Sequence, residues 1–166
     1  MWTLLSPLIV SRYLRRRGTD VVGIILDSSV LIASERRGKN AHHALKQIAE
    51  RVAGQDLAIS VVTVIELAHG IARSDTLERR EMRRLFLSEL IEALPVQPVT
   101  TTIALRAGQM DGERTSKGVC IALSDLLIGV TALELGYKVA TTNLRHFQMI
   151  PELEIVIWQA GSSSLS

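Results

Sequence analysis

The chain is poor in several residue types, and each shortage argues against a class of protein. Its 166 residues include one cysteine, Cys120, which excludes an intramolecular disulfide framework and a cysteine-rich zinc site. Aromatic residues make up only 4% of the chain, which argues against a surface that stacks single-stranded bases. The phosphate-binding patterns GxGxxG, GxxxxGKS and GxxxxGKT are missing, so nucleotide-cofactor chemistry has no support. A reducing, cytoplasmic setting suits this composition.

Excess basic charge is confined to the first twenty residues. That segment contains four arginines and one acidic residue, Asp20, which gives it a net charge of +3. The other 15 basic and 16 acidic residues give positions 21–166 a net charge of −1. Any polyanion that binds the larger part must therefore meet local patches or a metal ion rather than a global positive field.

The N-terminal segment, residues 1–20, differs in pattern from the rest of the chain. Its apolar stretch, about ten residues long, is too short for a stable membrane span. Its arginines come after that stretch, whereas the positive charges of a secretory signal precede it. Three interpretations stay open: a disordered tail, a start codon assigned too early, or a peripheral membrane anchor. We expect residues 21–158 to form one domain and residues 159–166 a flexible tail.

Short apolar runs alternate with helical patterns through the domain. The expected strands are 21–27, 57–60, 96–99, 138–142 and 153–158. The expected helices are 28–34, 41–54, 61–74, 75–94, 101–113 and 124–135. We expect Ser28 or Ser29 to cap the first helix and Ser74 the fourth, and Gly54 and Gly136 to end the second and sixth. The alternation predicts a three-layer α/β/α sandwich with a central, mainly parallel sheet.

Three acids stand alone in apolar or small-residue surroundings. Asp27 ends the first expected strand, Glu66 lies in the helix of VVTVIELAHG, and Asp125 lies in the first turn of an apolar helix. In parallel sheets, sites form at the carboxyl ends of the strands, so these acids can converge there. Converged carboxylates repel one another unless a cation lies between them, and Mg²⁺ or Mn²⁺ is the simplest candidate.

Each acid also has a structural explanation. Asp27 could cap the following helix. Glu66 shares a helical stripe with Thr63, Gly70 and Arg73 that could be a solvated face. Asp125 is favoured by the helix dipole by about 0.3–1 kcal/mol. However, a helix that is apolar on nearly every side is buried, and a buried carboxylate needs a partner.

A polar patch, TTNLRHF, comes after the fourth expected strand. Asn143 suits a tight turn, but its amide oxygen could also face a cation or a metal-bound water. His146 could be a solvated loop residue, a proton carrier or, beside Arg145, a phosphate contact. Ser29, two residues after Asp27, could help to orient that acid.

The ordered set of motifs is more informative than any one of them. The succession LDSSVLI, VTVIELAHG, SDLLIGVTALELG, ATTNLRHF and a closing PEL before the last strand resembles a PIN-domain ribonuclease over residues 22–158. The similarity is greatest to the VapC-type toxins of bacterial type II toxin–antitoxin pairs. It implies a metal-dependent endoribonuclease that inhibits growth. By motif, Asp27, Glu66 and Asp125 match the family's core acids, and Asn143 matches its fourth polar position.

The resemblance also implies metal ions, partners and a mechanism. Asp27 and Asp125 would hold Mg²⁺ or Mn²⁺, with Glu66 joining directly or through water. Some relatives carry Asp where His146 stands, which favours one tight metal here and a second brought by substrate. The implied partners are RNA, a VapB-type antitoxin in a groove walled by helices of residues 61–94, and a second copy in a homodimer. Basic residues at two places are candidate RNA-backbone contacts: Arg36, Arg37 and Lys39, and Arg145.

The long helix at 75–94 is expected to carry a leucine-rich face that is core, interface or both: Leu77, Leu85, Leu90 and Leu94. Its arginines, Arg79, Arg80, Arg83 and Arg84, could face an acidic partner or only water.

Three rival functions remain open. The first is a catalytically weak PIN-fold module that binds RNA or a partner, for which the uncharged Asn143 is the sequence support. The second is an aspartyl phosphotransferase that uses Asp27, although Ser29 stands where that chemistry needs a second Asp. The third is a DNA flap nuclease, which would also cluster acids.

Overall fold

A computed structural model describes residues 23–52 and 55–159. The predicted N-terminal extension, residues 1–20, lies outside the described residues, and so do residues 160–166 of the predicted tail 159–166. Val21, Val22 and Gly54 also lie outside them.

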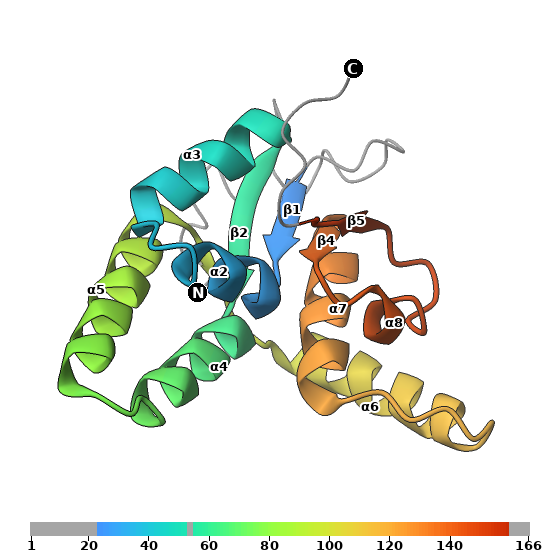
Figure 1. Ribbon diagram of the computed structural model, residues 1–166. Coiled ribbons are helices and arrows are strands. Elements are labelled where there is room, and N and C mark those ends of the chain that lie inside the picture. The colour runs from blue at the N-terminus through green and yellow to red at the C-terminus, as the bar shows by residue number, and fades with distance from the viewer. Residues whose placement is uncertain (1–22, 53–54, 160–166) are drawn as a thin grey trace, which may run out of the picture.

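Five parallel strands form one sheet, in the order β3-β2-β1-β4-β5 (Figure 1). Their bounds are Gly23–Leu26 for β1, Asp56–Ser60 for β2, Val96–Gln97 for β3, Lys138–Thr141 for β4 and Ile155–Ile157 for β5. The chain builds outward from β1 through β2 to β3 and then crosses to β4 on the other side of β1. The strand order therefore reverses between β1 and β4, which is where α/β sheets form their sites.

Helices cover both faces of this sheet (Figure 1). Their bounds are Ser28–Glu35 for α2, Ala41–Arg51 for α3, Val61–Ala72 for α4, Leu77–Ala93 for α5, Thr101–Thr115 for α6, Leu123–Leu135 for α7 and Leu144–Phe147 for α8. The predicted fold class, a three-layer α/β/α sandwich on a parallel sheet, is confirmed.

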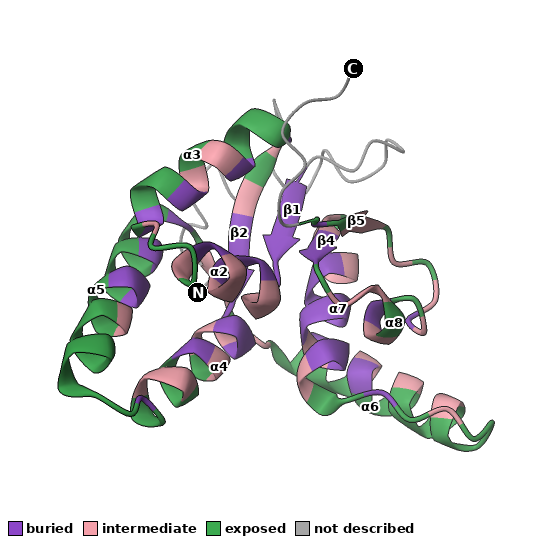
Figure 2. Cartoon of the chain, viewed as in Figure 1, coloured by how far each residue is buried: buried purple, intermediate pink, exposed green. Residues whose placement is uncertain are grey.

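The alternation of side chains along β1 divides the core in two. Ile24 and Leu26 face one side and pack with α2, α3 and α5, whereas Ile25 faces the other and packs with α6, α7 and α8. All three are fully buried. Helix α4 supplies Leu67 to the first half and Val62 to the second. Figure 2 shows this burial along the strands and along α7.

Most predicted elements exist, with ends shifted by a few residues. Gly136 ends α7 in the left-handed conformation, at φ 64°, as predicted. Helix α3 ends at Arg51, before Gly54. Strand β3 keeps only two of its four predicted residues, because Pro98 has no backbone N–H to extend a ladder.

Two predicted caps are wrong, because hydroxyl groups find other partners. The N-cap of α2 is Asp27, without a side-chain cap bond, and neither Ser28 nor Ser29 is the cap. Helix α5 is capped by Thr76, whose hydroxyl accepts from the N–H of Arg79, whereas Ser74 donates back to the carbonyl of Gly70.

The predicted leucine face of α5 is wrong in half of its members. Leu90 and Leu94 are buried, but Leu77 and Leu85 are 79% and 56% exposed. Phe86 and Leu87 take their place in the core. Leu85 precedes Leu90 by five residues, and that spacing turns the two side chains to different sides of a helix.

Candidate active site

Asp27 lies at the centre of a hydrogen-bonded cluster where β1 and β4 end. Its backbone N–H bonds the carbonyl of Ala140, which continues the β1–β4 ladder by one residue. Its Oδ2 atom accepts from the Ser29 hydroxyl at 2.5 Å and from the Thr141 hydroxyl at 2.8 Å. Because Asp27 is only 4% exposed, these two bonds hold a buried carboxylate in one orientation. Its side chain does not cap α2, so the capping explanation is wrong.

Asp125 lies in the first turn of α7. It is 9% exposed, and its Oδ2 atom lies 2.7 Å from Nδ1 of His146 on α8. Burial raises the pKa of Asp125 above the ordinary 3.8, the His146 hydrogen bond opposes this, and the charge of Asp27 raises it further. The two carboxylates therefore lie within electrostatic range of each other.

Glu66 is tied to the same cluster through Ser28. The Ser28 hydroxyl donates to Oε2 of Glu66 at 2.6 Å and thereby joins the N-terminal turn of α2 to α4. On the same helical stripe, Thr63 is fully buried and its hydroxyl donates to the carbonyl of Leu26. The stripe thus runs from the buried Thr63 to the exposed Arg73, and Thr63 fixes α4 directly to the end of β1.

The segment after β4 supplies the remaining predicted residues. Asn143 is half-buried at the N-cap of α8, and its side chain makes no cap hydrogen bond. Its backbone N–H donates to the hydroxyl of Thr141. The short helix α8 was not predicted; it directs His146 to Asp125 and leaves Arg145 exposed.

Sequence reasoning missed two members of the cluster, Ser28 and Thr141. Thr141 is fully buried and is the last residue of β4, beside the end of β1. Its position at a strand end was the available signal, but only the β1–β4 pairing brings its hydroxyl to Asp27.

Comparison with known proteins identifies the family. The sequence model of the PIN-domain family matches residues 24–153 of this chain. The chain belongs to the PIN-domain family.

Several of its relatives carry the name VapC. The chain is 40% identical to Ribonuclease VapC10 of Mycobacterium tuberculosis over 131 residues, 79% of this chain and 90% of that protein. It is 32% identical to the tRNA(fMet)-specific endonuclease VapC of Salmonella typhimurium over 102 residues, 61% of this chain and 75% of that protein. The resemblance drawn from the sequence motifs is thus confirmed.

Solved structures agree with this fold. A DNA-bound VapBC from Salmonella typhimurium matches with a TM-score of 0.70 and 25% identity, over 84% of this chain and 100% of that one. VapBC-1 from nontypeable Haemophilus influenzae matches with a TM-score of 0.67 and 27% identity, over 81% and 97%.

The PIN site offers the ligands that a hard cation needs. Asp27 and Asp125 present carboxylate oxygens close enough for one to raise the pKa of the other, and a divalent cation would relieve that repulsion. Within residues 23–52 and 55–159, no three His, Cys, Asp or Glu side chains are grouped closely enough to hold a metal ion. Mg²⁺ is often bound by one or two carboxylates and several waters, so this two-acid pair fits it.

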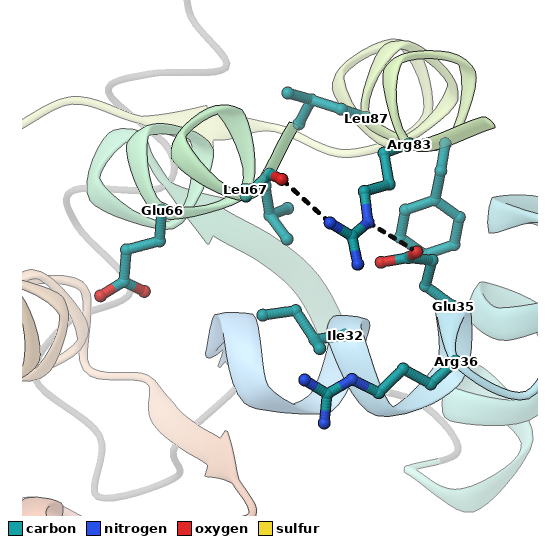
Figure 3. Close-up of a pocket in the computed structure, with 9 residues that line it drawn as sticks. Ile32, Glu35, Arg36, Glu66, Leu67, Arg83 and Leu87 are labelled. Carbon is teal, nitrogen blue, oxygen red and sulfur yellow. Dashed lines mark hydrogen bonds and ion pairs between the residues drawn. The ribbon is translucent and has the colours of Figure 1, made fainter. Parts of the chain in front are cut away.

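A pocket of about 150 Å³ lies between α2, α4 and α5, with Glu66 on its lining (Figure 3). Its apolar lining is Ile32, Leu67, Phe86 and Leu87. Glu66 borders it at one end, and Arg83 with Glu35 lies at the other (Figure 3).

The predicted RNA-backbone contacts differ in exposure. Arg36, Arg37 and Arg145 are exposed, and Arg36 also borders the pocket. Lys39 is half-buried and donates to the side-chain oxygen of Gln47, so it is less accessible to a phosphate. Among the described helices, none is both long and apolar enough to cross a bilayer.

Proposed function

We propose that this chain is an endoribonuclease that hydrolyses RNA phosphodiester bonds and acts as the toxin of a toxin–antitoxin pair. The proposal is supported by two buried carboxylates within electrostatic range of each other, Asp27 after β1 and Asp125 in the first turn of α7, in a chain similar to VapC ribonucleases. Because the proposed substrate is RNA, we propose that the chain acts in the cytoplasm.

Asp27 and Asp125 would hold Mg²⁺ or Mn²⁺, and Glu66 would reach the ion through water. When bound, such an ion polarises the phosphodiester and lowers the pKa of a coordinated water. The half-buried Asn143 would offer its amide oxygen to the same site. With Asn143 uncharged, the negative charge of the site comes from three acids, which favours one tightly held ion and a second that arrives with substrate.

The other side chains hold the acids in place or take part in proton transfer. The Ser29 and Thr141 hydroxyls fix Asp27, and His146 fixes Asp125. Glu66, held by Ser28, would orient the attacking water and accept its proton. The water oxygen attacks phosphorus in line while the bond from phosphorus to the leaving oxygen breaks. Arg145 and Arg36, both exposed near the site, would bind flanking phosphates.

The decisive experiment measures cleavage of a panel of in vitro transcribed structured RNAs with Mg²⁺, with Mn²⁺ and with EDTA. We expect metal-dependent cleavage that Asp27→Asn and Asp125→Asn each abolish. Asp111→Asn is the matched control, because it removes the same charge from an exposed position on α6. Equal cleavage by the wild type and both site variants would reject the nuclease site. RNA binding without cleavage would favour a catalytically weak binding module.

For the antitoxin, we propose that the pocket between α2, α4 and α5 takes an apolar segment of a VapB-type partner. The similarity of this chain to solved VapBC structures supports a VapB-type partner, and the apolar lining of the pocket suits an apolar segment. A Cβ added at Gly70, on the pocket wall, would meet no atom within 4 Å, so Gly70→Leu can fill the pocket without disturbing α4. We expect Gly70→Leu to weaken co-purification with the co-expressed antitoxin, whereas Gly108→Leu, on α6, leaves it unchanged.

For the second copy, we propose a homodimer. Large apolar side chains on α4, α6 and α7 are exposed to solvent, and a second copy would cover them: Ile65 at 62%, Leu105 at 72% and Leu123 at 67%. Light scattering of the purified chain tests this proposal, and a monomer mass at micromolar concentration would reject it.

A further inference from the structure

Two polar links join α2 to α4 on opposite sides of the pocket. At the N-terminal end of α2, the Ser28 hydroxyl bonds Glu66. At its C-terminal end, the carboxylate of Glu35 bonds Arg83 of α5, which in turn bonds α4. Between these two links, the pocket leaves part of the interface between α2 and α4 without direct packing. The links therefore influence the spacing of α2 and α4 more than they would in a close-packed interface.

Arg83 makes three contacts with a single guanidinium group. Its Nε donates to Oε1 of Glu35 at 3.0 Å, and its Nη1 donates to the carbonyl of Gly70 at 2.9 Å and to the Ser74 hydroxyl at 3.1 Å. Its side chain is 28% exposed and that of Glu35 is 23% exposed, so the pair is largely shielded from water.

The contact with Gly70 satisfies a helix end. Gly70 lies in the last turn of α4, where the N–H of Ser74 bonds Ile71 and the Gly70 carbonyl accepts from the Ser74 hydroxyl and from Arg83 instead. A cation at this end also suits the helix dipole. Arg83 therefore holds the C-terminal end of the helix that carries Glu66 one turn earlier.

We propose that Arg83 is a positioning residue that sets the spacing of α2 and α4 and thereby places Glu66 for the reaction. The proposal rests on the nuclease function proposed above. Without this guanidinium, only the Ser28–Glu66 bond remains of the two links described above, and we expect that carboxylate to move away from its working position.

The test compares Arg83→Gln with Arg80→Gln, which removes the same charge from an exposed position on the same helix. The probe is the RNA of the panel that the wild-type chain cuts. We expect Arg83→Gln to lower kcat by roughly tenfold with little change in KM, and Arg80→Gln to leave kcat unchanged. Arg83→Lys keeps the positive charge but has one donor nitrogen in place of three. It should fall between them, and it replaces the Gln variant if that variant does not fold.

A double-mutant cycle separates positioning from a general loss of structure. In a Glu66→Gln background, Arg83→Gln should cost less than about a further twofold in kcat, because the carboxylate that it positions is gone. In a Ser28→Ala background, by contrast, Arg83→Gln removes the second link as well and should cost more in kcat than it does in the wild-type chain. An equal loss in the wild-type and variant backgrounds would overturn the proposal.

Amide hydrogen exchange tests the clamp without relying on nuclease activity. Arg83→Gln should speed exchange in residues 66–72 of α4 relative to Arg80→Gln and leave α7 unchanged. Unchanged exchange in α4 would refute the clamp even if RNA is cut. Faster exchange in a chain that cuts no RNA would reject the proposed function and retain the clamp.

Discussion

Replacing Thr141 by Val removes one hydroxyl and little volume, so it isolates the hydrogen bonds of the acid cluster. Thr141 is fully buried, and its hydroxyl donates to Oδ2 of Asp27 at 2.8 Å and accepts from the N–H of Asn143 at 2.9 Å. A bond to a charged group contributes about 1.5–3 kcal/mol, and an N–H left without a partner costs about 1–3 kcal/mol. Water can reach the half-buried Asn143, so we expect a total loss of about 2–4 kcal/mol in the free energy of unfolding.

Thr131→Val is the matched control. Thr131 is also fully buried, but its hydroxyl donates only to the carbonyl of Leu127, one turn back in α7, which the helix already uses. We expect this variant to stay within about 0.5 kcal/mol of wild type.

Urea denaturation followed by circular dichroism in EDTA measures both variants. For a chain of this length, the Thr141→Val loss corresponds to a fall in Tm of about 5–15 °C. Because Asp27 would also lose its fixed orientation, RNA cleavage should fall with Thr141→Val and not with Thr131→Val. If the two valine variants were equally stable, the hydroxyl would not hold the cluster together.

Three further expectations rest on burial and close contacts. Asp125→Asn should raise Tm in EDTA at pH 7. The folded-state pKa of Asp125 is raised, so the ionised carboxylate destabilises the folded chain fully above that pKa, and the difference in Tm between variant and wild type should vanish as the pH falls toward 3.8. A variant less stable than wild type at pH 7 would contradict this. Gly129→Ala should destabilise the fold by about 1–3 kcal/mol in thermal melts, because its Cβ would strike the Ile150 side chain. Gly108→Ala on α6 has open space around it and should stabilise the fold by about 0.5–1 kcal/mol. A Gly129→Ala variant more stable than Gly108→Ala would count against the packing of α7. Leu90→Ala, at a fully buried position of α5, should cost about 2–5 kcal/mol in urea denaturation, and a loss below about 1 kcal/mol would place Leu90 outside the core.

The pattern of apolar and polar residues was sufficient for the fold class and for the list of acids. Short β-branched runs that alternate with amphipathic segments can bury their apolar faces only as strands between helix layers. Asp27, Glu66 and Asp125 were recognisable because a lone acid in apolar surroundings needs a reason to be there. Local chemistry also fixed the end of α7, since Gly136 adopts a backbone conformation that other residues rarely take.

Features that depend on pairing between distant segments were not predictable. The buried face of α5 was predicted only in part, because packing against the sheet selected Phe86 and Leu87 and left Leu77 and Leu85 exposed. Ser28 was expected to cap its own helix, yet it bonds Glu66, which lies 38 residues further along the chain.

The sequence alone determined which residue types this protein brings to its site, because burial and periodicity are properties of neighbouring residues. Only the tertiary structure decided how those residues meet. The pairing of β1 with β4 brings Thr141 to Asp27, and α8 turns His146 toward Asp125. The reason is that a hydrogen bond forms only at about 3 Å, and no pattern along the chain records which distant residues come that close.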